Sequence, residues 1–136
     1  MEPLTILLVF LSIFFSLVIM DSIWLGKITN KFIIREFGEL ITLEKGSLKL
    51  NLKAGALAWI AIAFGCYIFV VVNSTEIIEV LTTGALFGFI AYSIYDLTNL
   101  TFIKNYPKKF AALDILWGTF LCSCISAIGY LVKGLL

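Results

Sequence analysis

The sequence lacks histidine altogether and contains only three cysteines. The absence of histidine removes the usual haem ligand, the commonest zinc ligand and the usual proton shuttle. The cysteines are Cys66, Cys122 and Cys124, which lie in apolar runs without C-x-x-C spacing. This context is typical of small packing residues rather than metal ligands or disulfide partners. We therefore expect neither a metal nor a redox cofactor.

Charge is also scarce. Only 14% of the residues are charged and 61% are hydrophobic, and the mean hydropathy is +1.06, which exceeds what a soluble domain can bury. A spanning helix needs about 20 mostly apolar residues. Four runs reach that length, at residues 4–25, 54–72, 80–100 and 110–132. The sequence therefore predicts an all-α integral membrane four-helix bundle that forms a single domain over residues 1–136. The first run lacks a basic leading region, so we expect a retained helix rather than a signal peptide.

The few basic residues are unevenly distributed between the apolar runs. Nine of the ten Lys and Arg residues lie in the first and third loops, and the exception is Lys133. They are Lys27, Lys31, Arg35, Lys45, Lys49, Lys53, Lys104, Lys108 and Lys109. Because basic loops stay in the cytoplasm, the sequence predicts a multi-pass protein of the cell inner membrane with both termini on the outer side.

The first loop contains an amphipathic pattern over about residues 30–45. Apolar residues recur at helical spacing at Ile33, Phe37, Leu40 and Ile41. We expect a cytoplasmic interfacial helix that begins at Thr29 or Asn30 and ends at Gly46 and Ser47. The simpler interpretation is a helix that closes the floor of the bundle; the alternative is a docking surface for a partner or substrate.

Three aspartates stand out within the apolar runs: Asp21, Asp96 and Asp114. In the predicted topology all three lie in the cytoplasmic third of the bilayer, each roughly 7 to 11 Å from the midpoint of its helix. No Lys or Arg lies at that depth. An ionised carboxylate in hydrocarbon is costly, so such residues usually face a bundle interior or water. We expect the three to converge, with a shared proton or a bound cation between them.

Small residues line the same helix faces as the aspartates. The stripes are Gly84, Gly88, Tyr92, Asp96 and Asn99; Asp114, Gly118, Cys122 and Ser126; and Ala54, Ala58, Ala61 and Gly65. Stripes of this kind let helix backbones approach closely in a membrane. They predict that the packing faces coincide with the polar faces, which directs the aspartates inward.

A structural interpretation of the same residues stays open. Asp114 is placed to cap the last helix after Pro107, and Asp21 to pair with Lys27. The aromatic residues near the helix ends are also typical of the belt at the level of the lipid headgroups. These are Trp24, Trp117, Tyr95 and Tyr106.

Three strings in the chain resemble the signature of a bacterial inner-membrane family, domain of unknown function 2177. They are D-S-I-W-L-G at residues 21–26, Y-D-L-T-N-L at residues 95–100 and D-I-L-W-G at residues 114–118. The resemblance covers nearly the whole chain and implies a small four-helix fold without an established activity. All three aspartates lie in these strings. The candidate ligand- or ion-binding residues are Asp21, Asp96, Asp114, Asn99, Tyr92, Tyr95, Trp24 and Trp117.

Three functional classes remain. The first is binding or transport of a proton, a cation or a cationic small molecule through the aspartates. The second is a structural or assembly subunit of a membrane complex. The third is an intramembrane hydrolase that uses two aspartates as general acid and base, so whether the chain is an enzyme stays open. The expected partners are the lipid bilayer, a small cation or small-molecule ligand, and a second copy or another membrane protein; we expect no nucleic acid.

Overall fold

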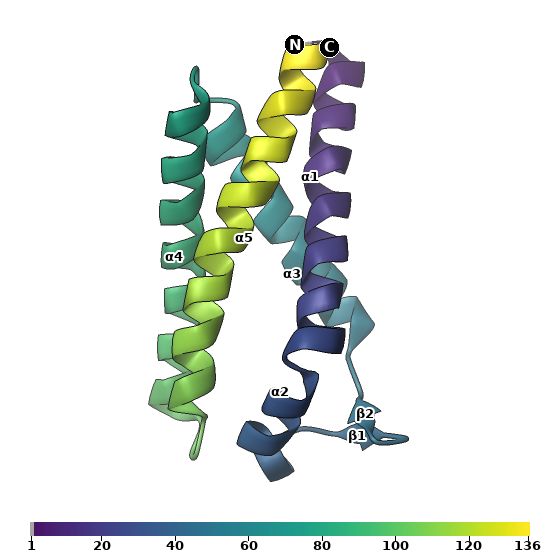
Figure 1. Cartoon of the computed structure of the whole chain (residues 1–136), viewed down its shortest axis with the longest axis vertical. Coiled ribbons are helices and arrows are strands. Elements are labelled where there is room, and N and C mark those ends of the chain that lie inside the picture. Colours follow the sequence, from purple (N-terminus) through teal and green to yellow (C-terminus); the bar gives the residue numbers. More distant parts are fainter. Residues whose placement is uncertain (1) are drawn as a thin grey trace.

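The computed structural model describes residues 2–136 and consists mainly of four long helices, with both termini at the same end (Figure 1). The elements are α1 (Pro3–Ile23), α2 (Asn30–Phe37), β1 (Leu43–Glu44), β2 (Ser47–Leu48), α3 (Leu52–Gly65), α4 (Ile77–Phe102) and α5 (Lys108–Leu135). Wider π-helical turns extend α1 over Trp24–Ile28 and α3 over Cys66–Val71. Four helical segments are long and apolar enough to cross a membrane, which confirms the predicted all-α membrane bundle.

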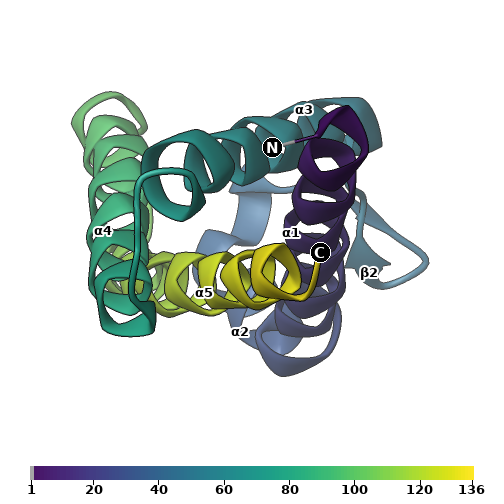
Figure 2. The same ribbon diagram turned by 90° about the horizontal axis from the view of Figure 1, so that it is seen from above.

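The four long helices stand at the four sides of the bundle (Figure 2). The closest pair is α4 and α5. A Cβ added at Gly88 would overlap the carbonyl oxygen of Gly118, and one added at Gly84 would meet the carbonyl oxygen of Cys122 at 2.9 Å. The glycines thus bring the two backbones together, as the small-residue stripes on these two helices predict.

The main apolar core lies between α1, α5 and the π-helical turns after α3. Its fully buried members include Val9, Ile13, Leu17, Cys66, Val71, Leu121, Cys122 and Ile125. Gly129 makes room for Ile13, whose side chain would clash with an added Cβ. Cys66 and Cys122 are buried and unbridged in this core, and Cys124 is half-buried, also without a disulfide.

The small-residue stripe of α3 does not pack closely against a neighbouring helix along its whole length, although the sequence predicted that it would. Against the second span, α4 packs mainly on Cys66–Val71 rather than on Leu52–Gly65. Only Gly65 of the stripe is in close contact, with the ring of Phe87, whereas Ala54, Ala58 and Ala61 are exposed. The helices therefore separate toward the end that carries the first and third loops, hereafter the basic end (residues 27–53 and 103–109).

The amphipathic helix at the basic end is shorter than predicted. It ends at Phe37 and not at Gly46, because the next residue, Gly38, has a left-handed φ of +51°; a 3-10 turn over Gly38–Leu40 follows. A glycine is the residue that most readily adopts this conformation, so it stops the helix. The chain then forms the short antiparallel hairpin of β1 and β2, whose turn at Lys45 and Gly46 has positive φ at both residues.

The start of α2 also differs from the expected cap. Thr29 does precede the helix, but its hydroxyl donates to the carbonyl oxygen of Trp24 at 2.8 Å instead of capping α2. From there α2 packs on the third loop and the start of α5, in a second apolar cluster. The buried members of this cluster are Ile33, Tyr106, Phe110 and Ala111. The amphipathic segment therefore packs against the floor of the bundle.

Candidate functional site

The three aspartates lie on different helices, on the basic-end half of the bundle, and all are buried. Asp96 of α4 is completely enclosed, and Asp21 of α1 and Asp114 of α5 are each 8% exposed. Their surroundings differ, so each is described in turn.

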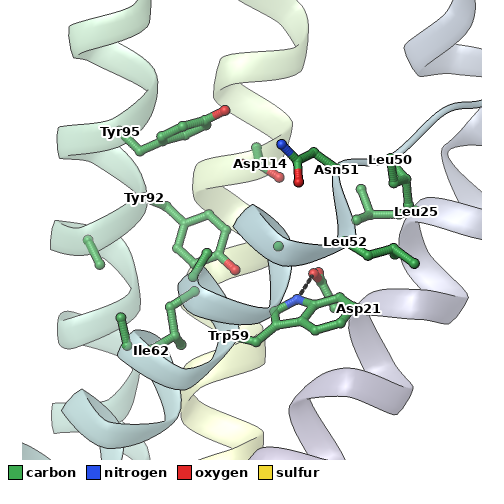
Figure 3. Close-up of a pocket in the computed structure, with 14 residues that line it drawn as sticks. Asp21, Leu25, Leu50, Asn51, Leu52, Trp59, Ile62, Tyr92, Tyr95 and Asp114 are labelled. Atoms are coloured by element: carbon green, nitrogen blue, oxygen red, sulfur yellow. Dashed lines mark hydrogen bonds between the residues drawn. The ribbon is translucent and has the colours of Figure 1, made fainter. Parts of the chain in front are cut away.

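Asp21 is held by two tryptophans from other helices. The Nε1 of Trp59 donates to Oδ2 at 2.8 Å and the Nε1 of Trp117 donates to Oδ1 at 3.0 Å. Figure 3 shows the first of these bonds. Trp117 in turn stacks on Trp24, with ring centroids 4.2 Å apart and planes at 2°. Within residues 2–136 the one ion pair is Arg35 with Glu36, so the expected pairing of Asp21 with Lys27 is wrong.

Asp96 is bonded to the third loop. The hydroxyl of Tyr106 donates to its Oδ1 at 2.8 Å, and the amide of Asn99 donates to the hydroxyl oxygen of Tyr106 at 3.5 Å. The ring of Tyr106 is held edge-on by Phe37 of α2, at 5.5 Å between centroids. Burial raises the pKa of the Tyr106 phenol above its ordinary value, so this hydroxyl remains a donor at neutral pH.

Asp114 faces Asp96. The two carboxyl groups lie within hydrogen-bonding range of each other, yet Oδ2 of Asp96 is buried without any N–H or O–H donor from the described residues. A second carboxyl can fill that role only when it carries a proton. Asp114 lies well inside α5, which begins at Lys108 after Pro107, so the expected capping role for Asp114 is wrong.

A cavity of about 450 Å³ opens beside these carboxyl groups (Figure 3). Its polar lining residues are Asp21, Asn51, Trp59, Tyr92, Tyr95 and Asp114. The remaining lining is apolar: Leu25, Leu50, Leu52, Gly55, Ala58, Ala61, Ile62 and Ala91. No Lys or Arg of residues 2–136 contributes to it. The cavity occupies the space where α3 and α4 separate, and it includes two of the three predicted aspartates.

Of the other predicted residues, some line the cavity and the rest lie next to the residues that line it. Tyr92 and Tyr95 line the cavity, and the ring of Tyr92 packs on Gly118. Asn99 lies beside Tyr106 outside the cavity. Trp24 and Trp117 lie behind Asp21 and do not line it. The Nε1 of Trp24 is buried and has no acceptor among the described residues.

Residues 6–131 match a family model described as "Predicted membrane protein (DUF2177)". The chain belongs to this family. Searches among curated proteins and among solved structures find no match to the chain. For this DUF2177 protein the family therefore supports a multi-pass membrane protein, in agreement with its four apolar spans.

Three residues of the candidate site were missing from the prediction. Trp59 and Asn51 line the cavity, and Tyr106, expected in the headgroup belt, bonds Asp96. Trp59 had a usable signal, since it is an aromatic donor next to Ala58 in the small-residue stripe. Tyr106 had none, because the loop between Asp96 and Tyr106 breaks the helical spacing on which the prediction relied.

Among residues 2–136, no three His, Cys, Asp or Glu side chains come together in a group that could hold a metal ion. Asp96 and Asp114 lie within hydrogen-bonding range of each other, and Asp21, which the two indoles hold, lines the same cavity as Asp114.

Proposed function

We propose that this protein binds a small organic cation with an apolar body in the cavity between α3 and α4. Asp114 and Asp21 supply the counter-charge, and the aromatic side chains supply the walls. The observation that carries the proposal is a cavity of about 450 Å³ that two carboxyl groups and no Lys or Arg of the described residues line. Polar groups of this kind inside a membrane span are expensive and usually mark a binding site.

The size and lining of the cavity favour an organic ligand over a bare ion. Pockets for small molecules measure about 300–1,000 Å³ and are mostly apolar with a few placed polar groups. A proton or metal ion needs far less space. Trp59, Tyr92 and Tyr95 border the cavity, and aromatic faces attract cations within about 6 Å of the ring. An ammonium or phosphonium group with apolar substituents suits this combination.

The pair of Asp96 and Asp114 also raises the hydrolase alternative, since two adjacent carboxyl groups are typical of aspartic proteases. Such an enzyme needs a water and a scissile bond within reach of both groups. Asp96 is completely enclosed, its Oδ1 accepts from Tyr106, and it does not line the cavity. The geometry supports ligand binding better than hydrolysis.

We further propose that the cavity lies in the cytoplasmic half of an inner membrane, with both termini outside, because loops rich in Lys and Arg favour the cytoplasmic side. Introducing a cysteine at Lys108 and labelling intact cells with an impermeant thiol reagent tests this orientation. We expect Lys108→Cys to react only after the cells are opened, while Glu76→Cys, in the opposite loop, reacts in intact cells. The reverse pattern would invert the assignment.

Isothermal titration calorimetry of the purified chain in detergent tests the binding proposal. Tetraphenylphosphonium, a lipophilic cation, is expected to bind, and the neutral triphenylphosphine oxide is not. Asp114→Asn should weaken cation binding at least about tenfold, which corresponds to about 1.4 kcal/mol. Glu76→Gln, an exposed carboxylate at the opposite end, serves as the matched control and should bind as the native chain does. Equal heats for cation and neutral analogue would refute the proposal.

A further inference from the structure

The buried pair of Asp96 and Asp114 lies at the edge of the cavity. Asp114 lines the cavity and Asp96 does not. Oδ2 of Asp96 is enclosed and lacks any N–H or O–H donor from the described residues, and the carboxyl of Asp114 lies within hydrogen-bonding range. Two ionised carboxylates at that range, away from water, would repel each other strongly. A proton between them removes both the repulsion and the missing hydrogen bond.

The charged and titratable groups around this pair supply no positive charge. Asp21 approaches from α1, Tyr92 and Tyr95 lie on α4, and Tyr106 comes from the third loop. The segment of α3 that lines the cavity contributes no ionisable side chain. The one ion pair of residues 2–136, Arg35 with Glu36, lies on α2. Nothing but a proton or an arriving cation can therefore compensate a second carboxylate.

We propose that Asp96 and Asp114 share one proton and that an organic cation binding at Asp114 displaces it, so that the protein exchanges a cation for a proton. This inference rests on the proposed function and deepens it. Before binding, the pair carries one proton and one negative charge. After binding, it carries two negative charges and the positive charge of the ligand, and the proton has passed to water. The net charge of the buried pair and its ligand is unchanged, which is what a low-dielectric site requires.

Tyr106 acts as a positioning residue for this exchange. Its hydroxyl donates to Oδ1 of Asp96 at 2.8 Å, and it stabilises the carboxylate that the departing proton leaves. Phe37 and Phe110 fix its ring at centroid distances of 5.5 Å and 6.3 Å. Because burial raises the pKa of its phenol, Tyr106 stays a donor throughout the pH range in which the pair changes charge.

The test counts protons released as tetraphenylphosphonium binds. The native chain in detergent is titrated in two buffers of different ionisation enthalpy, since the difference between the observed heats gives the number of protons. We expect roughly one proton released per cation, and Asp96→Asn should bind the cation with no release. Native binding without release would overturn the exchange while leaving the proposed function intact. Release from Asp96→Asn equal to the native value would overturn it as well. Absence of any binding would instead refute the proposed function.

A second variant keeps the test decisive if Asp96→Asn does not fold. Tyr106→Phe retains the ring and removes only the hydroxyl, so the carboxylate of Asp96 loses its donor and the proton becomes harder to displace. Cation affinity at neutral pH should then fall several-fold, by about 1 kcal/mol, and should recover as the pH rises. Affinity equal to the native value across the pH range would contradict the role of Tyr106. Glu76→Gln again serves as the control that should leave the proton count unchanged.

Discussion

The long helices pack closely in one half of the bundle and separate around a cavity in the other. At the end with the termini, α1, α5 and the turns Cys66–Val71 enclose an apolar core, and Gly84 and Gly129 bring neighbouring elements into contact. At the basic end α3 and α4 separate around a cavity, and the small residues Ala58 and Ala61 border open space. Small residues are therefore tight contacts in one half and room for a ligand in the other.

The polar groups follow the same division. Asp21, Asp96 and Asp114 all lie on the side where the helices diverge, and each has a hydrogen-bond donor or a carboxyl neighbour from another element. The buried polar side chains of the opposite half carry hydroxyl and thiol groups, such as those of Ser126 and Cys66. We infer that the packed half holds the helices in place. The buried carboxyl groups and the cavity make the basic-end half less stable, as is common for binding sites.

The largest effect is expected from the same substitution made in both halves. Gly88→Ala places a methyl group against the backbone oxygen of Gly118, which cannot move aside without separating α4 from α5. Its unfolding free energy should fall by about 3 kcal/mol. Gly55→Ala, at a cavity glycine with nothing within 4 Å of the added atom, should be neutral or stabilising by up to about 1 kcal/mol. Reversible unfolding in mixed micelles measures the unfolding free energy of both variants. Equal decreases in the two variants would contradict the difference in packing between the halves.

A smaller loss of stability is expected at Asp21. An amide in its place can accept from one indole, but its NH₂ group then faces the other N–H donor. Asp21→Asn should therefore lower the unfolding free energy by about 1–2 kcal/mol. Glu76→Gln, at an exposed carboxylate, should change it by less than about 0.5 kcal/mol. An unchanged stability in Asp21→Asn would show that the two tryptophans do not depend on this carboxylate.

Filling the cavity with a larger side chain should abolish ligand binding without changing the stability of the fold. Ala58→Leu occupies the space between α3 and α4 and should abolish tetraphenylphosphonium binding, with a stability change below about 0.5 kcal/mol. Ala54→Leu is the matched control, because Ala54 is exposed on the same helix and does not line the cavity. Calorimetry and thermal unfolding on the two variants give the comparison. Native-like binding by Ala58→Leu would place the ligand elsewhere.

The smallest effect concerns alkaline pH. Burial raises the pKa of Tyr106 in the folded chain above the ordinary tyrosine value of about 10. The folded state then holds its proton longer than the unfolded state, so this contribution to stability is complete below about pH 10 and is lost as the pH rises toward the folded pKa. The native chain should lose stability above about pH 10 more steeply than Tyr106→Phe. Parallel pH profiles of the two proteins would remove this effect.

The sequence predicted the spans well because apolar runs of this length leave few alternatives. The observed helices lie within a few residues of the predicted ones, once the π-helical turns Trp24–Ile28 and Cys66–Val71 are included. The same spans place all three aspartates in the basic-end half of the bundle, where the structure has them. The end of α2 was not predicted, because the apolar pattern continues through Leu40 and Ile41 and hides the left-handed stop at Gly38.

The arrangement of the site was harder to predict than the half of the bundle in which it lies. Helical spacing places Asp96 and Gly88 on one face, but it contains no information on how far α3 tilts from α4. The same stripe pattern therefore predicted close packing at Ala58, where the structure has a cavity. The partners of Asp21 come from positions 38 and 96 residues away, a pairing that only the tertiary fold determines.

The central claim, that an organic cation occupies the cavity at Asp114, is tested most directly by thiol protection. Cysteine is placed at Ala58 or at Ala54, in a chain whose three native cysteines are replaced by alanine and whose cation affinity is first shown to match the native value. Labelling with a small maleimide is then timed with and without tetraphenylphosphonium. We expect protection of the cysteine at position 58, none at position 54, and loss of protection on adding Asp114→Asn. Equal labelling at position 58 with and without the cation would contradict it.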